Sequence, residues 1–102
     1  MATRSTINKL NKDGTVTSIY CHWDGYPEHH MPLLKAGYTE EKDVDELLAL
    51  GSLSKLGFKP KLCSAYHRDW GEDLRIQHYN SAKEINKEEY NYLWTDGEWF
   101  LI

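Results

Sequence analysis

The sequence predicts an α+β domain in which an antiparallel sheet packs against one main helix. Two turn signals indicate the sheet: Asp13-Gly14 near the start of the chain and Asp96-Gly97 near its end, each flanked by strand-like residues. A helical spacing of apolar residues from about 40 to 50 indicates the helix. The 102 residues fit a single domain, 1–102, with one hydrophobic core.

The first element is a β-hairpin that runs from Thr3 to Trp23. Asp-Gly favours a tight turn because glycine adopts a positive φ without steric cost. A three-residue loop, 12–14, sets the register and pairs Ile7 with Ile19 and Ser5 with Cys21 on one face. The other face then carries Arg4, Thr6, Tyr20 and His22. A loop one residue longer or shorter would exchange the two faces.

Helical signals follow the hairpin. A short helix is predicted over 28–36, weakened by Pro32, which cannot donate a backbone hydrogen bond. Thr39 is the expected N-cap of the main helix over about 40–50, and Gly51 is its natural stop. Its buried stripe is Val44, Leu47 and Leu48. Its acidic residues are read as a solvated face: Glu40, Glu41, Asp43, Asp45 and Glu46.

The second half of the chain supplies the rest of the sheet. Residues 52–60 are predicted to form a loop, 61–67 and 74–79 one or two further strands, and 80–88 a loop or short helix. The C-terminal hairpin closes the domain. A two-residue turn at Asp96-Gly97 would place Leu93 opposite Phe100 and Trp94 opposite Trp99.

Composition excludes some functions. The net charge is −4 and no stretch of basic residues occurs, so direct nucleic-acid binding is not expected. The N-terminus has no long apolar run, which predicts neither a signal peptide nor a membrane anchor. The expected location is therefore the cytoplasm, where Cys21 and Cys63 would remain reduced thiols.

Metal and catalytic sites are weakly indicated. Cys21 and His22 are adjacent, so on a strand they point to opposite faces and cannot readily share an ion. Cys63 and His67 would be more than ~12 Å apart on an extended strand. Cys21 lies among apolar residues, which raise a thiol pKa. No glycine-rich phosphate loop occurs. We therefore expect no metal and no cofactor, and a small enzyme using cysteine and histidine stays an alternative.

A small-ligand pocket is the best-indicated site. Three segments combine aromatic rings with hydrogen-bonding or cationic groups, which suits a nucleotide-like ligand. Their candidate binding residues are Arg4, Thr6, His22, Trp23, Asp24, Tyr26, His67, Arg68, Asp69 and Trp70. The arginines would hold phosphate oxygens, and the aromatic residues would stack on a base. The competing interpretation is structural: turns at Asp24-Gly25 and Trp70-Gly71, and a surface ion pair between Arg68 and Asp69 or Glu72.

Motifs in these segments resemble a family of small uncharacterised proteins of tailed phages, prophages and some bacterial genomes. They are TRSTI (3–7), IYCHWDGYPE (19–28), LLALGSLSKLG (47–57), YHRDWGED (66–73) and YNYLWTDGEWF (90–100). His29-His30-Met31-Pro32 departs from the pattern, so His29 and His30 are expected to be surface residues without a function. The resemblance implies an accessory protein of an infected bacterial cytoplasm.

Function is predicted from that context. The first hypothesis is non-enzymatic counter-defence, in which the protein sequesters a small nucleotide-derived signal. A homo-oligomer is expected, because 102 residues leave little room for an enclosed pocket. The alternative is an inhibitor that binds a host defence protein or a CRISPR-type nucleic-acid enzyme through the acidic helix or the C-terminal hairpin. The third is an enzyme using Cys21, His22 or His67.

Overall fold

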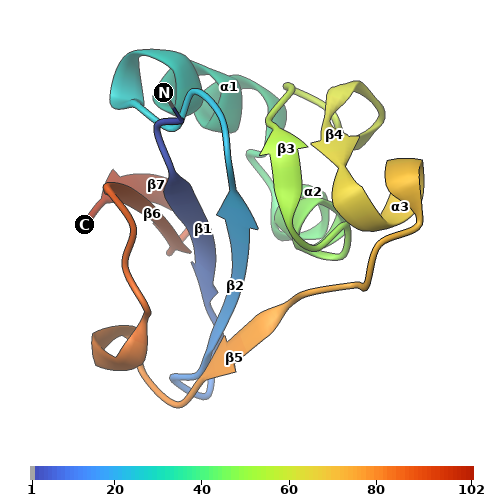
Figure 1. Cartoon of the computed structure of the whole chain (residues 1–102). Helices are drawn as coiled ribbons and strands as arrows, with labels where there is room; N and C mark the ends of the chain where they lie inside the picture. Colours follow the sequence, from blue (N-terminus) through green and yellow to red (C-terminus); the bar gives the residue numbers. More distant parts are fainter. Residues whose placement is uncertain (1) are drawn as a thin grey trace.

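The computed structural model describes residues 2–102 and, within them, an open seven-stranded mixed sheet with three α-helices (Figure 1). The strands are β1 (Ser5–Leu10), β2 (Val16–Cys21), β3 (Leu53–Lys55), β4 (Ser64–Ala65), β5 (Gln77–Tyr79), β6 (Tyr90–Thr95) and β7 (Glu98–Leu101). The helices are α1 (Pro27–Gly37), α2 (Glu41–Leu48) and α3 (Tyr66–Trp70), with 3-10 turns η1 (Pro60–Leu62) and η2 (Ala82–Glu84). The predicted α+β class is confirmed.

The sheet is mixed, whereas the sequence predicted an antiparallel one. Its strand order is β4-β3-β2-β1-β6-β7, and β5 pairs with the first half of β2. Both predicted hairpins are antiparallel, but they meet through β1 and β6, which run parallel. Helices α1 and α2 form the crossover connection between β2 and β3. Because this connection is long enough to bring the chain back to the starting end of the sheet, β3 can pair parallel to β2.

The predicted hairpin registers are confirmed. Ile7 pairs with Ile19 and Ser5 with Cys21, and the Asn11 N–H donates to the Thr15 carbonyl at 2.8 Å across the loop. In the second hairpin Leu93 pairs with Phe100 and Trp94 with Trp99. Asp96 and Gly97 both have positive φ, 52° and 77°, as a tight two-residue hairpin turn requires.

The two faces of the sheet differ. On the face that α1 and α2 cover, here the helix face, lies the core; it contains Ile7, Ile19, Cys21, Tyr92 and Trp99 from the strands and Leu34, Tyr38, Val44 and Leu47 from the helices. The opposite face, here the open face, carries buried polar residues: Thr6, Asn8, Ser18 and Asn91. Part of it lies under the segment 80–89, which contains η2 and the buried Ile85.

The helices differ from prediction in length and cap. The helix predicted over 28–36 is confirmed as α1, which has eleven residues and contains Pro32, so it covers the sheet beside the expected main helix. Its buried side chains, His30 and Leu34, hold it against the core despite the proline. The N-cap of α2 is Glu40, where Thr39 was expected, because Glu40 and Asp43 form a reciprocal capping box. The helix spans 41–48, not 40–50.

The segment after α2 also departs from the predicted strands. Residues 61–67 form the end of η1, the two-residue β4 and the start of α3. Residues 52–60, predicted as a loop, contain β3, and the strand predicted over 74–79 is shortened to 77–79. No helix within residues 2–102 is long and apolar enough to cross a membrane.

Candidate functional site

Three of the predicted site residues surround Tyr20, which lies on β2. Thr6 is the direct cross-strand partner of Tyr20 on the open face. The His22 Nδ1 hydrogen-bonds the Tyr20 hydroxyl at 2.6 Å. Arg4 is close enough for its charge to act on the pKa of Tyr20, which burial raises and Arg4 opposes. The N-terminal hairpin therefore brings Arg4, Thr6 and His22 together around one aromatic ring.

Thr6 is committed to the sheet. Its hydroxyl donates to the Asn91 Oδ1 at 2.7 Å and accepts from the Asn8 Nδ2 at 2.9 Å. The Asn91 amide in turn exchanges hydrogen bonds with the backbone of Glu88. The Thr6 hydroxyl therefore links β1 to β6 and, through Asn91, to the segment before β6. Its role is to position the wall of the hollow, because its proton is already donated to Asn91 and is not free for a ligand.

Arg68 forms a structural clamp on α3. Its Nε and Nη2 donate to the two Asp69 carboxylate oxygens, while Nη1 and Nη2 donate to the carbonyls of Pro60 and Cys63. Four of the five guanidinium N–H groups are thus used. Asp69 also accepts from the Ala65 N–H, and the nearby arginine lowers the Asp69 pKa to about 2. The structure therefore places this pair as an ion pair that fixes η1, β4 and α3.

The remaining predicted residues lie on the surface. Trp23 and Tyr26 are exposed on either side of Asp24, whose positive φ of 57° marks the turn after β2. Trp70 is exposed, and the Nδ1 of the exposed His67 bonds the Glu72 carbonyl at 2.7 Å. Of the ten predicted residues, only Thr6 lines any of the five hollows described in residues 2–102.

Two hollows have Tyr20 in their lining, and the pair is here called the Tyr20 trough. One measures about 170 Å³ and is lined by Tyr20, Ser52, Tyr66, Glu72, Asp73 and Arg75. The other measures about 200 Å³ and is lined by Thr6, Ser18, Ile19, Tyr20, Gln77, Tyr79, Asn86 and Glu88. The trough joins two of the three predicted segments, 4–6 and 66–72. Thr6 belongs to the first, and Tyr66 and Glu72 are the ends of the second.

The predicted list of binding residues lacks Tyr20, Tyr66 and Arg75, although Tyr66 begins the predicted ligand-binding segment 66–72. Strand alternation placed Tyr20 on the same face as Arg4, Thr6 and His22, so that signal was available. Tyr66 and Arg75 carried no such signal. Tyr66 was assigned to a strand and lies on α3, and Arg75 lies in the irregular segment before β5. Only the fold brings these two residues to β2.

The histidine and cysteine residues have structural environments. Burial raises the pKa of the Cys21 thiol to about 12, which keeps it neutral and unreactive at neutral pH. His30, expected on the surface, is fully buried; its Nε2 lies 3.1 Å from the Ser5 hydroxyl and its ring lies against Tyr92. Within residues 2–102 no group of three or more His, Cys, Asp or Glu side chains could hold a metal ion.

The acidic residues of α2 and its cap form a mostly exposed face, as predicted, but several of them also have structural partners. Lys9 of β1, which is buried, bonds Glu41 at 2.9 Å and Asp45 at 2.7 Å. Glu40 and Asp43 form the capping box. Four of the five acids therefore have structural partners, although Lys9 supplies only one positive charge to this face.

The Tyr20 trough is therefore the place where the predicted residues and a hollow coincide. Its aromatic rings, carboxylates and arginine are groups that bind nucleosides, and neither a cysteine nor a histidine is among its lining residues. Comparison with protein-family models, with curated proteins and with solved structures found no significant match to this chain.

Proposed function

We propose that this protein binds a small nucleoside-type ligand in the Tyr20 trough without changing it chemically. The observation that supports this most directly is that two hollows share Tyr20 in their lining. Each hollow has a smaller volume than the usual ligand pocket of roughly 300–1,000 Å³, but the combined volume of the two lies within that range. The ring of Tyr20 lies where such a ligand would stack.

The charges of the trough restrict the ligand. Its carboxylates are Glu72, Asp73 and Glu88, which accept hydrogen bonds from ribose hydroxyls or an exocyclic amine. Its cations are Arg75, which lines it, and Arg4, which acts on Tyr20 from nearby. With more acids than arginines, the trough favours a nucleoside carrying one phosphate over a polyphosphate, which the acids would repel.

The biological role that fits this binding is sequestration of a nucleotide-derived defence signal by a phage accessory protein in the host cytoplasm. That context comes from the resemblance of the TRSTI, IYCHWDGYPE and YHRDWGED motifs. Capture without catalysis agrees with the environment of Cys21, whose thiol burial keeps protonated. An inhibitor that uses the acidic helix is less favoured, because Lys9 and the capping box already engage most of its carboxylates.

The test is ligand-induced thermal stabilisation of the full chain across a panel of AMP, GMP, ADP-ribose, 3′,5′-cyclic AMP and cyclic dinucleotides. At least one ligand that contains a nucleoside monophosphate should stabilise the protein at a concentration well above its Kd. ATP, tested beside the panel, should stabilise it more weakly. Arg75→Ala should abolish the shift. Lys61→Ala, which removes an exposed cation at a different hollow, should keep it. No shift with any member of the panel would refute the proposal.

Recovery of the ligand separates binding from catalysis. The ligand that stabilises the protein is incubated with it and released by denaturation, and its mass is measured by mass spectrometry. An unchanged mass is expected. A changed mass that persists in His22→Ala and His67→Ala variants would contradict sequestration and point to other reacting groups.

A further inference from the structure

Strand β7 forms one edge of the sheet. Along it, every second residue directs its backbone N–H and C=O groups away from β6. The Ile102 N–H donates to the Asn91 carbonyl at 2.9 Å, which fixes the alternation of hydrogen-bonded pairs between β6 and β7. Phe100 and Glu98 then bond inward to β6. The N–H and C=O groups of Trp99 and Leu101 point outward from the free edge of the sheet. The sheet can therefore accept one more strand there.

The side chains along this edge are apolar and exposed. Phe100 projects from the open face with 44% of its surface exposed, and Leu101 projects from the helix face with 48% exposed. No Lys, Pro or bulge protects β7, although natural edge strands usually carry such a feature. The other edge strands are shorter: β4 has two residues and runs directly into α3, and β5, which pairs only with β2, has three. β7 is thus the edge open to pairing.

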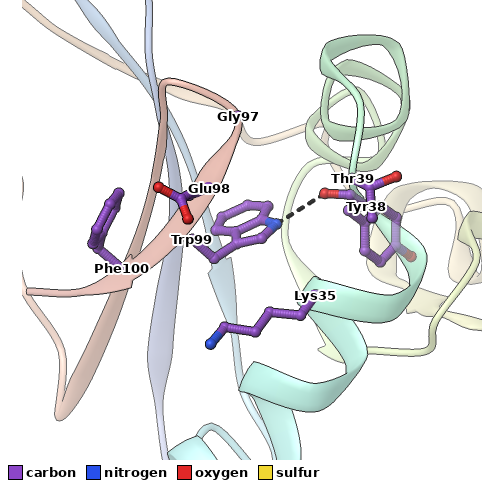
Figure 2. Close-up of a pocket in the computed structure, with 7 residues that line it drawn as sticks. All are labelled: Lys35, Tyr38, Thr39, Gly97, Glu98, Trp99 and Phe100. Atoms are coloured by element: carbon purple, nitrogen blue, oxygen red, sulfur yellow. Dashed lines mark hydrogen bonds between the residues drawn. The ribbon is translucent and has the colours of Figure 1, made fainter.

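A hollow of about 460 Å³ lies beside β7 on the helix face, lined by Lys35, Tyr38 and Trp99 among others. Figure 2 shows Trp99 and Lys35 extending into the space between β7 and α1, with Phe100 on the other side of the strand. The Trp99 Nε1 donates to the Tyr38 carbonyl at 3.0 Å and holds the ring in place. The hollow is therefore a fixed feature with room for an apolar side chain.

We propose that a second copy of this chain occupies the edge, with its β7 antiparallel to the first and a two-fold axis at Phe100. In this register Trp99 faces the partner's Leu101, and the outward N–H and C=O groups of the two residues bond one another. The partner's Leu101 enters the hollow beside Trp99. Phe100 lies directly opposite the partner's Phe100 on the open face, as an aromatic cross-strand pair.

The spacing within β7 selects both this occupant and this register. The hollow at Trp99 and the projecting Leu101 are two residues apart on the same face, so one antiparallel register fills both hollows at once. A register centred on Trp99 would place Leu101 opposite the partner's Gly97 and leave the hollows empty. It would also set Glu98 against the partner's Phe100, whereas the proposed register sets Glu98 against the partner's Ile102.

Sedimentation velocity tests the register through complementary charges at the axis. The wild-type chain is expected to dimerise at micromolar concentrations, consistent with a small interface. Phe100→Glu and Phe100→Lys should each be monomeric, with affinity reduced at least about tenfold, because like charges would then lie directly opposite each other. An equimolar mixture of the two should recover a dimer, because residue 100 faces its own equivalent.

Phe58→Glu is the matched control, since Phe58 has nearly the same exposure as Phe100, 45% against 44%, but lies in the segment after β3. It should dimerise like the wild type. A second readout uses Phe100→Cys: the new thiols should form an interchain disulfide on oxidation, whereas the buried Cys21 and Cys63 should not react. A wild-type chain that is monomeric up to millimolar concentration overturns the proposal. So does a charge-pair mixture that stays monomeric, or capture of a host protein by β7 in place of a second copy.

Discussion

His30 shows how far one residue can depart from its expected place. His30 was expected on the surface because its segment departs from the family pattern, but the helix at 27–37 includes it on the inner face. Burial, with a smaller contribution from His29, lowers the pKa of His30 to about 3. The imidazole is therefore neutral in the folded protein, with Ser5 as its hydrogen-bond partner and Tyr92 against its ring.

This environment predicts a pH dependence of stability. Unfolding returns the His30 pKa to about 6.5, so the unfolded state binds the extra proton between about pH 6.5 and pH 3. The stability that neutral His30 contributes is complete above about pH 6.5. It is lost as the pH falls toward 3, by up to about 1.4 kcal/mol per pH unit.

Urea denaturation of the wild type and of His30→Gln, from pH 7 to pH 4, measures that loss. The free energy of unfolding of the variant should fall less steeply than that of the wild type. His67→Gln, at an exposed histidine, should follow the wild type. Parallel curves for His30→Gln and the wild type would show that His30 does not titrate in this way.

At the scale of elements, the end of α1 depends on Gly37. A Cβ at Gly37 would lie 1.8 Å from the Phe58 carbonyl oxygen, so the backbone of α1 and that of the segment after β3 are in direct contact. Tyr38 then donates its hydroxyl to the Gly57 carbonyl at 2.7 Å and holds the same segment. This contact positions the wall of the hollow beside β7.

Gly37→Ala should destabilise the protein by about 3 kcal/mol or more, at the upper end of overpacking, because backbone atoms cannot rotate away. An ordinary Gly→Ala change inside a helix would instead stabilise it by about 1 kcal/mol. Gly14→Ala is the control: its φ is +88° with no atom within 4 Å, so only backbone strain of about 1–2 kcal/mol applies. Chemical denaturation compares the two, and equal losses would mean that the two segments move apart readily.

At the scale of the whole molecule, Lys9 ties the sheet to the helical layer. It lies on the helix face of β1 and reaches Glu41 and Asp45 on α2, with its Nζ 6.0 Å from the centre of the Trp94 ring. Burial opposes its charge, but the hydrogen bonds that its ammonium donates to both carboxylates outweigh burial and raise its pKa above 10.5. Its contribution to stability is therefore complete below pH 10.5 and is lost as the pH rises through the folded pKa.

Lys9→Met should cost about 1 kcal/mol at pH 7, since the carboxylates are half exposed and solvent screens the pair. The methionine keeps the apolar stem against Trp94. The difference from the wild type should shrink above pH 10.5, which denaturation at pH 7 and pH 11 would measure. Lys42→Met, at an exposed lysine with a 3.6 Å contact to Glu40, should change stability little at either pH. A difference that does not depend on pH would assign the cost to packing alone.

Local chemistry allowed much of the fold to be predicted. The Asp-Gly turns predicted both hairpins and their registers, because glycine at a positive φ fixes the loop length and the loop length fixes the pairing. The apolar stripe at Val44, Leu47 and Leu48 predicted α2 to within a few residues. Strand alternation in the first hairpin placed Arg4, Thr6, Tyr20 and His22 on one face, and of these Thr6 and Tyr20 line the trough.

The tertiary structure decided what local signals could not. The parallel pairing of β1 with β6 and of β2 with β3 depends on chain segments far apart in sequence, and no turn signal encodes it. Arg68, predicted to hold phosphate, is instead bonded to Asp69, Pro60 and Cys63, because the fold of η1 and β4 turns two carbonyls toward it. Tyr66 and Arg75 line a hollow with Tyr20 only because the fold brings α3 and the segment before β5 to it. The residue types of the site could thus be read from the sequence, whereas long-range packing determined which of them meet.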